Sequence, residues 1–414
     1  MMGDKAPKKF PLAVASSNAL ALDLYSRYAY AHPKENLFFS PLGVTSALSM
    51  ALAGARDTTA EQLIRMMHID RDLFQTQREM ADLFGFLKWD VAGMHIANGV
   101  FVRNGYRPSF DYWSGVHRTH GAELHEVDFV ENSEMVRRSI NTWMNDCSRG
   151  QIQEILGPGA VTSASRICLV NGVHFQSQWP KPFFPSDIRQ HMFHSSYDAT
   201  PGFETPDEDD VAVEMVSRID TFGYVVNKDL SFSAVEVAHK GEKTSLVIVL
   251  PNQVHDFCVL EERVNLESLL DVTKGMVMTP DVELCLPRLK LDFGMDLTDT
   301  LYYMGLLDLF TDYANLHGMF DMNPGRAYLT EFMHHAVAEM ANDSSSDSSS
   351  ALHSPAGGVP SPRGSIMKKK GSKKRRASVV RTTMPFIVNR PFIFFVLHRE
   401  LQLILYLGTI KKIA

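Results

Sequence analysis

Apolar residues in the first part of the chain are spaced as in helices. Residues 12–31 carry apolar side chains three and four positions apart, which predicts an opening helix. Ser40 is followed by Pro41, a capping residue and a proline suited to the first helical turn. This pair predicts a second helix that runs to Ala53 and is ended by Gly54.

From residue 166 onward the pattern changes to short apolar runs of the kind that form strands. One helix interrupts them at residues 297–304. Helices that precede strands and then return predict a mixed α+β domain. The predicted strands cover residues 167–175, 233–237, 245–250, 282–291, 385–388 and 392–397.

Residues 342–384 break this pattern. A serine-rich tract is followed by a proline- and glycine-containing stretch and then by the basic run Lys368–Arg376. Strand-like sequence resumes at once beyond it, so the segment is predicted to be a long exposed loop within one domain. Loops of this length usually carry binding, cleavage or regulation.

Charge is unevenly distributed along the chain. The 414 residues include 45% hydrophobic residues, enough for a large core, and carry a net charge of −7. Nine basic residues and no acidic residue lie between Arg363 and Arg381, so the remainder carries −16. An acidic body with one basic loop suits an acidic partner or a protease that prefers basic residues.

Several classes of protein are disfavoured. The four cysteines have no metal-ligand spacing, and Cys168 and Cys285 lie in apolar runs, so buried free thiols are expected, with no metal and no cofactor. No nucleophile-elbow, zinc-protease, phosphate-loop or dinucleotide motif is present, so an enzyme is not expected. The sequence shows neither a signal peptide nor a transmembrane run. We therefore expect a cytoplasmic or nuclear protein, with leaderless export to the extracellular space as the alternative, and no membrane association.

A series of short motifs, spread in order over about 370 residues, resembles the serpin family. Each motif is weak alone, but their order makes a chance match very improbable. They include Asn36–Pro41 before a helix, Ile140-Asn141-Thr142-Trp143, Leu169-Val170-Asn171, Leu286-Pro287-Arg288 and Asn389-Arg390-Pro391-Phe392.

This resemblance implies the α+β serpin fold, in which a helical N-terminal region packs on three β-sheets. It implies an extension at 1–11, a single monomeric domain at 12–414, and an extended reactive loop at 342–384. Serpins that inhibit proteases act as suicide substrates: the protease cuts the loop, and the part before the cut inserts into the central sheet as a new strand.

The resemblance also assigns positions to four residues. Ser40, Asn171 and His334 should meet beneath the central sheet in a hydrogen-bonded cluster that parts when a strand enters, and Trp179 should lie where insertion begins. Gly43 stands where the family commonly has a serine, so the cluster should be thinner. His334 is expected to be a core histidine with satisfied hydrogen bonds, without an acid–base role.

The hinge that must enter the sheet is unusual for an inhibitor. Ser344 replaces the expected glycine, and Asp347 falls among positions usually held by alanine. Prolines 355, 360 and 362 lack the amide that a central strand needs. The interval to the expected cut is also about twice the usual length, which loop-closure entropy tolerates. The hinge comprises Asn342, Asp343, Ser344, Ser345, Ser346 and Asp347.

The spacing back from Asn389 places the scissile bond at Arg376–Ala377, after Lys373, Lys374 and Arg375. One interpretation is bait for a trypsin-like or convertase-like serine endopeptidase that prefers Arg or Lys. A second is a non-inhibitory scaffold whose run Lys368–Arg376 binds a polyanion or nucleic acid, or directs nuclear import. A third is regulation by phosphorylation, and the last is a solvated loop without a dedicated task.

Overall fold

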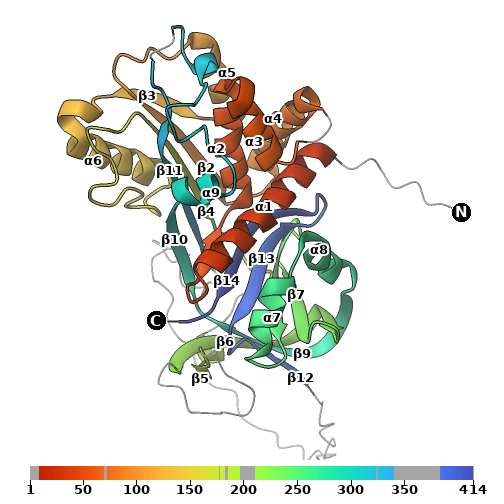
Figure 1. The fold of residues 1–414 in the computed structure, drawn as a ribbon. Helices are drawn as coiled ribbons and strands as arrows, with labels where there is room; N and C mark the ends of the chain where they lie inside the picture. Colours follow the sequence, from red (N-terminus) through yellow and green to blue (C-terminus); the bar gives the residue numbers. More distant parts are fainter. Residues whose placement is uncertain are drawn as a thin grey trace, which may run out of the picture.

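The computed structural model describes residues 9–69, 72–176, 178–181, 185–195, 210–322, 325–339 and 383–413. Two hydrogen-bonded sheets are surrounded by helices (Figure 1). The helices are α1 (Pro11–Ala31), α2 (Pro41–Gly54), α3 (Asp57–Met66), α4 (Leu73–Asp90), α5 (Phe110–His120), α6 (Phe129–Cys147), α7 (Asp256–Arg263), α8 (Leu266–Lys274) and α9 (Thr298–Tyr303). Two single 3-10 turns are η1 (Pro185–Asp187) and η2 (His317–Met319).

The smaller sheet has five strands in the order β10-β11-β4-β2-β3. Its central pair, β11 and β4, is parallel, whereas β10 and β2 run antiparallel to their neighbours β11 and β4. The strands are β2 (Met94–Arg103), β3 (Glu123–Val127), β4 (Ile167–Phe175), β10 (Lys290–Asp296) and β11 (Leu329–Glu339).

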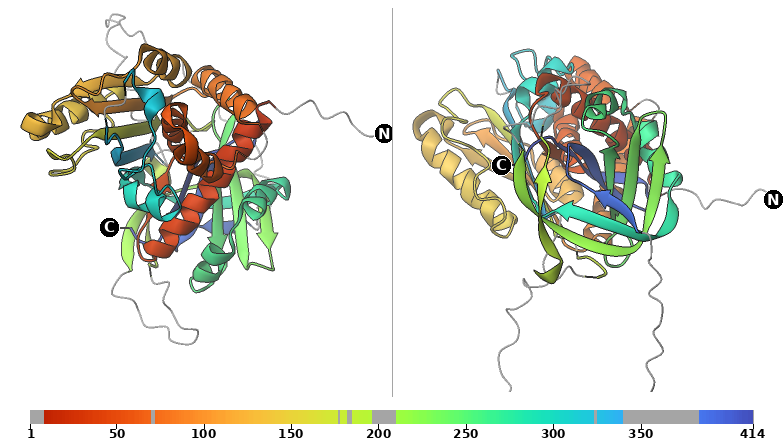
Figure 2. Two further views of the ribbon diagram at one scale, coloured as in Figure 1. Left: turned by 45° about the horizontal axis from the view of Figure 1, so that its top comes forward. Right: turned by 90° about the horizontal axis from the view of Figure 1, so that it is seen from below.

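The larger sheet has nine strands and curves strongly, as the view from below shows (Figure 2). Its order is β1-β14-β13-β8-β7-β6-β9-β12, with β5 also paired to β6. The long strand β6 pairs with β7 and also with β9 and β5. It therefore links strands that would otherwise form two separate sheets, so two of the three expected sheets are continuous. The strands are β1 (Leu37–Phe39), β5 (Ile188–Phe193), β6 (Val211–Asn227), β7 (Phe232–Ala238), β8 (Thr244–Pro251), β9 (Val277–Pro287), β12 (Met384–Ile387), β13 (Phe392–His398) and β14 (Leu403–Ile410).

The two faces of the smaller sheet pack against different cores. Leu169 and Val173 of β4 point into the main core, which α1, α2 and the larger sheet share. Cys168 and Val170 point the other way, into a separate cluster beneath α6. Because both faces are covered, all nine residues of β4 are buried and most of them are apolar, as in strands buried on both sides.

Most predicted elements are present. The predicted opening helix corresponds to α1, the Ser40–Pro41 helix to α2, and residues 167–175 to β4. The single strand predicted at 282–291 is wrong, because residues 282–287 belong to β9 in the larger sheet and residues 290–291 begin β10 in the smaller one. The apolar pattern continues across this change of sheet. The sequence analysis also missed β2 and β3.

The four cysteines, all within the described residues, form no disulfide, and Cys168 and Cys285 are buried as predicted. Among the described helices, none combines the length and apolar character that crossing a membrane requires.

Candidate functional site

The candidate site is the line along which β4 and β11 meet, which we call the seam. The two strands pair in parallel from Ile167 and Leu329 to Phe175 and Ala338, with a register shift after Leu329. A strand that entered between them in the opposite direction would pair antiparallel with both. Antiparallel pairing is somewhat more stable per residue than parallel pairing, so a strand added here would replace one parallel pairing with two more stable antiparallel ones.

His334 of β11 and Asn171 of β4 form a side-chain hydrogen bond across the seam on its inner face. The distance from His334 Nδ1 to Asn171 Oδ1 is 2.7 Å. The backbone amide of Ser40 donates to His334 Nε2 at 2.9 Å, and the Ser40 hydroxyl donates to the carbonyl of Leu405 on β14 at 2.8 Å. The structure thus brings together Ser40, Asn171 and His334, all fully buried.

The hydrogen bonds continue beyond these three residues. Asn171 donates to Asn98 Oδ1 of β2 at 2.8 Å, and Asn98 donates to Ser46 Oγ at 3.0 Å. Ser46 of α2 lies 3.3 Å from Nδ1 of His120, at the end of α5. The sequence analysis missed Ser46, Asn98 and His120. The only signal was one asparagine within the apolar run of β2.

Burial keeps the two histidines of this network, His334 and His120, neutral. The pKa of His334 is lowered to about 3, mainly because burial disfavours the imidazolium and also because His335 is close. Burial alone lowers the pKa of His120 to about 4. Because His334 Nε2 accepts from Ser40, its proton is on Nδ1, which donates to Asn171. His334 therefore has satisfied hydrogen bonds and holds two strands together, and this geometry gives it no acid–base task.

Gly43 lies directly beneath the seam. Its amide donates to Ser40 Oγ at 3.3 Å. A Cβ atom at position 43 would lie 2.4 Å from Asn171 Oδ1 and 3.1 Å from His334 Cε1. The space of a serine side chain is therefore occupied by the His334–Asn171 pair itself.

Trp179 lies close to the C-terminal end of β4. Its ring centroid is 4.9 Å from that of His239, which also packs edge-on against Phe175 at 5.6 Å. His239 Nδ1 lies 2.9 Å from Thr244 Oγ1, and burial lowers the pKa of His239 to about 4. A neutral aromatic cluster therefore packs at this end of the seam.

A buried carboxyl group marks the opposite end of the seam. Glu331, at the register shift of β11, accepts hydrogen bonds from the hydroxyls of Ser165 at 2.6 Å and Thr330 at 2.5 Å. Burial raises the pKa of Glu331 to about 7, the nearby carboxylate of Asp296 raises it further, and the two hydroxyl hydrogen bonds oppose the shift. The ends of the seam therefore differ in chemistry, with a buried carboxyl group at one and a neutral aromatic cluster at the other.

The outer face of the seam is covered by α6 and the segment that follows it. Met144 and Ile152 press on Gly172 of β4, where a Cβ atom would lie 2.4 Å from the Met144 sulfur. Val170 and Met333, one from each strand, belong to the same apolar cluster. Opening the seam must therefore loosen this cover as well as the inner hydrogen bonds.

The predicted hinge and scissile residues lie outside the described residues. These are Asn342, Asp343, Ser344, Ser345, Ser346 and Asp347 in the hinge, and Lys373, Lys374, Arg375, Arg376 and Ala377 at the expected cut. The structure does describe the two flanks of this segment. β11 ends at Glu339 in the smaller sheet, and β12 begins at Met384 in the larger one.

Comparison with known proteins gives a consistent result. The family model described as serpin (serine protease inhibitor) matches residues 15–413. Iris from Ixodes ricinus is 31% identical, covering 95% of this chain and 97% of its own length, and leukocyte elastase inhibitor from Sus scrofa is 29% identical over 96% and 98%. Uncleaved ovalbumin has a similar fold, with a TM-score of 0.81 at 22% identity, covering 97% of this chain and 99% of its own.

Proposed function

The chain belongs to the serpin family of serine protease inhibitors and is not itself an enzyme, and we propose that it is a suicide substrate for a serine endopeptidase that cleaves after Arg or Lys. The observation that carries the proposal is the seam: a closed parallel pair whose strand β11 leads directly into the segment that would be cut. The similarity to leukocyte elastase inhibitor supports inhibition as the activity, and Arg376 supports the basic specificity.

In the proposed mechanism the protease cleaves Arg376–Ala377 and remains attached to Arg376 as an acyl-enzyme. The freed segment then enters between β4 and β11. Its backbone forms hydrogen bonds on both sides, each with a net contribution of about 1 kcal/mol. The His334–Asn171 bond must break first, so the network on the inner face sets part of the barrier. We propose that the protein acts as a monomer in the cytoplasm or the nucleus.

The test is incubation with a trypsin-like and a convertase-like protease, followed by denaturing electrophoresis. We expect an SDS-stable complex and a higher melting temperature after loop cleavage. Arg376→Ala should abolish the complex, while Lys370→Ala, which removes one charge from the same basic run, should preserve it. Cleavage by every protease without a stable complex, and without a gain in melting temperature, would reject inhibition.

The composition of the hinge favours a second candidate, a non-inhibitory serpin. An ionised Asp347 would cost several kcal/mol if it were buried without a partner, and the three prolines cannot pair in a central strand. In that case the run Lys368–Arg376 would bind a polyanion or nucleic acid, direct nuclear import, or be controlled by phosphorylation. Nuclear accumulation that is lost when residues 373–376 are changed to alanine, together with failure to form complexes, would favour this candidate.

A further inference from the structure

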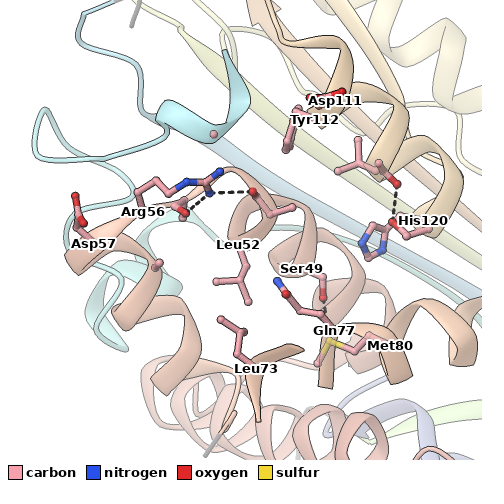
Figure 3. Close-up of a pocket in the computed structure, with 17 residues that line it drawn as sticks. Ser49, Leu52, Arg56, Asp57, Leu73, Gln77, Met80, Asp111, Tyr112 and His120 are labelled. Carbon is pink, nitrogen blue, oxygen red and sulfur yellow. Dashed lines mark hydrogen bonds between the residues drawn. The ribbon is translucent and has the colours of Figure 1, made fainter. Parts of the chain in front are cut away.

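A cavity of about 660 Å³ lies between α2, α3, α4 and α5, away from the seam (Figure 3). Its walls are largely apolar, with Leu52, Leu73, Met80 and Val116 contributed by three of these helices. The volume falls within the range of sites that hold small organic ligands. Shape and apolar walls alone do not identify an occupant, so we infer the chemistry of the ligand from the polar atoms that line the cavity.

His120 supplies one polar atom at the end of the cavity, as Figure 3 shows. Ser46 Oγ accepts a hydrogen bond from Asn98 and lies 3.3 Å from His120 Nδ1, to which its hydroxyl can donate. When the hydroxyl donates in this way, the His120 proton is on Nε2. Among the described residues, the hydrogen bonds of the His120 side chain involve Nδ1 alone. In that tautomer the Nε2–H group is a hydrogen-bond donor without a partner among the described residues.

Gln77 of α4 lines the same cavity and makes no side-chain hydrogen bond among the described residues. Its carboxamide offers both a donor and an acceptor. Figure 3 shows Gln77 and His120 on the same side of the cavity as Ser49. A ligand with an oxygen acceptor at one end would satisfy groups that the protein leaves without partners.

The charges around the cavity select against ionic ligands. Asp57 and Asp111 carry carboxylates at its edge, which disfavour an anion. Arg56 is the cation, and it already donates to the carbonyls of Ala53 and Ala55. A ligand cation would face the N–H group of His120. An uncharged molecule avoids both conflicts.

We propose that this cavity binds an uncharged, mainly apolar molecule of aromatic or similar bulk, whose carbonyl or hydroxyl oxygen accepts a hydrogen bond from His120 Nε2. The apolar body lies against Leu52, Met80 and Val116. The ligand site uses no residue of the reactive loop, so the proposal does not rest on the protease-inhibitor function.

The position of His120 gives the site a second property. A ligand hydrogen bond at Nε2 favours the tautomer in which Ser46 donates to Nδ1, at the end of the chain Ser46–Asn98–Asn171–His334. Binding should therefore reinforce the His334–Asn171 bond and slow amide hydrogen exchange along β4 and β11.

Glycine positions provide a matched pair of variants for the test. A Cβ atom at Gly115, which lines the cavity, would meet no atom within 4 Å, and the same is true of Gly85 on the exposed surface of α4. Gly115→Leu fills the cavity from α5, whereas Gly85→Leu makes the same helical substitution outside it. Both should fold, because replacing a mid-helix glycine favours the helix.

The probe is Prodan, an uncharged naphthyl ketone whose emission shifts to the blue in apolar surroundings. We expect saturable binding with one probe per chain, a loss of at least tenfold in affinity in Gly115→Leu, and unchanged affinity in Gly85→Leu. Hydrogen exchange along β4 and β11 should slow with the probe in the wild-type protein and not in Gly115→Leu. Equal binding by both variants, or no saturable binding, would refute the site. Equally tight binding of the anionic probe anilinonaphthalene sulfonate at the same position would refute the assignment to an uncharged ligand.

Discussion

The seam and the β13–β14 pair join neighbouring strands by different means. β13 and β14 are antiparallel, and every side chain along both strands is buried. Phe394 of β13 and Tyr406 of β14 both stack on Phe38, with centroid distances of 5.8 Å and 5.1 Å. The seam is parallel and carries the polar pair His334–Asn171 on its inner face.

The difference shows where this fold can open. Hydrogen bonds broken at the seam can be replaced by bonds to an incoming strand, so the free-energy cost of separating β4 and β11 is offset as that strand enters. Apolar surface exposed between β13 and β14 would have no such replacement, and burying an aromatic side chain stabilises by about 1.5–3 kcal/mol. A chain that must admit a strand therefore places satisfied polar groups at the entry line and aromatic packing in the sheet that must stay closed.

Phe394→Ala should produce the largest loss, because it leaves a cavity at the aromatic stack. We expect the free energy of unfolding to fall by about 3–5 kcal/mol, as measured by urea denaturation. Hydrogen exchange should rise throughout the molecule, without preference for β4 and β11. Val226→Ala, at a half-exposed site on β6, is the control and should change stability by less than about 0.5 kcal/mol. A similarly small effect of Phe394→Ala would contradict the claim that aromatic packing holds β13 and β14 together.

His334→Ala should have a smaller effect on stability and a more local one. It leaves Asn171 Oδ1 and the Ser40 amide without a partner, and we expect a loss of about 2–3 kcal/mol. Hydrogen exchange should rise most along β4 and β11, and self-association on heating should accelerate.

The matched control for that variant is His335→Ala. The neighbouring imidazole bonds to Asp292 of β10 at 2.6 Å, across the antiparallel pair and not across the seam. If His335→Ala opens β4 and β11 to exchange as strongly as His334→Ala, the seam has no special role in holding the sheet closed.

The smallest effect concerns the acid at the end of the seam. The pKa of Glu331 in the folded protein, about 7, is above its ordinary value of 4.5. Its contribution to stability is therefore fully present below pH 4.5 and lost as the pH rises through 7. Glu331→Gln should stabilise the protein by about 1–2 kcal/mol at pH 8.5 and change little at pH 4.5. Thermal melts over this range provide the measurement, with the exposed Glu126→Gln of β3 as control. A gain that did not vary with pH would contradict the assignment.

The predictable elements were those with local signals. Ser40 and Pro41 define the start of α2 because a cap and its proline act within one helical turn. β4 was predictable because nine consecutive buried positions favour apolar residues. The division between β9 and β10 was not, since the apolar pattern runs on while the chain passes from one sheet to the other.

The site was predictable only in part, for a similar reason. The resemblance to serpins implied the meeting of Ser40, Asn171 and His334. Ser46, Asn98 and His120 are brought together from α2, β2 and α5, and no spacing rule relates residues so far apart. The role of Gly43 could be recognised only in the structure. The resemblance implied a thinner hydrogen-bonded cluster, whereas the structure shows that His334 and Asn171 fill the space beside Gly43.

β12 fixes the C-terminal flank of the segment 340–382 to the larger sheet. This strand has four residues and, among the described strands, pairs with β9 alone, at the end of the larger sheet. The other flank of the segment is fixed in β11, in a different sheet. In the uncut chain β12 ties the far flank of the segment to the larger sheet, whereas cutting frees the part before the cut from this tether. How long the intact protein keeps its starting fold is then set by a rate. The four residue pairs between β12 and β9 help to slow that rate.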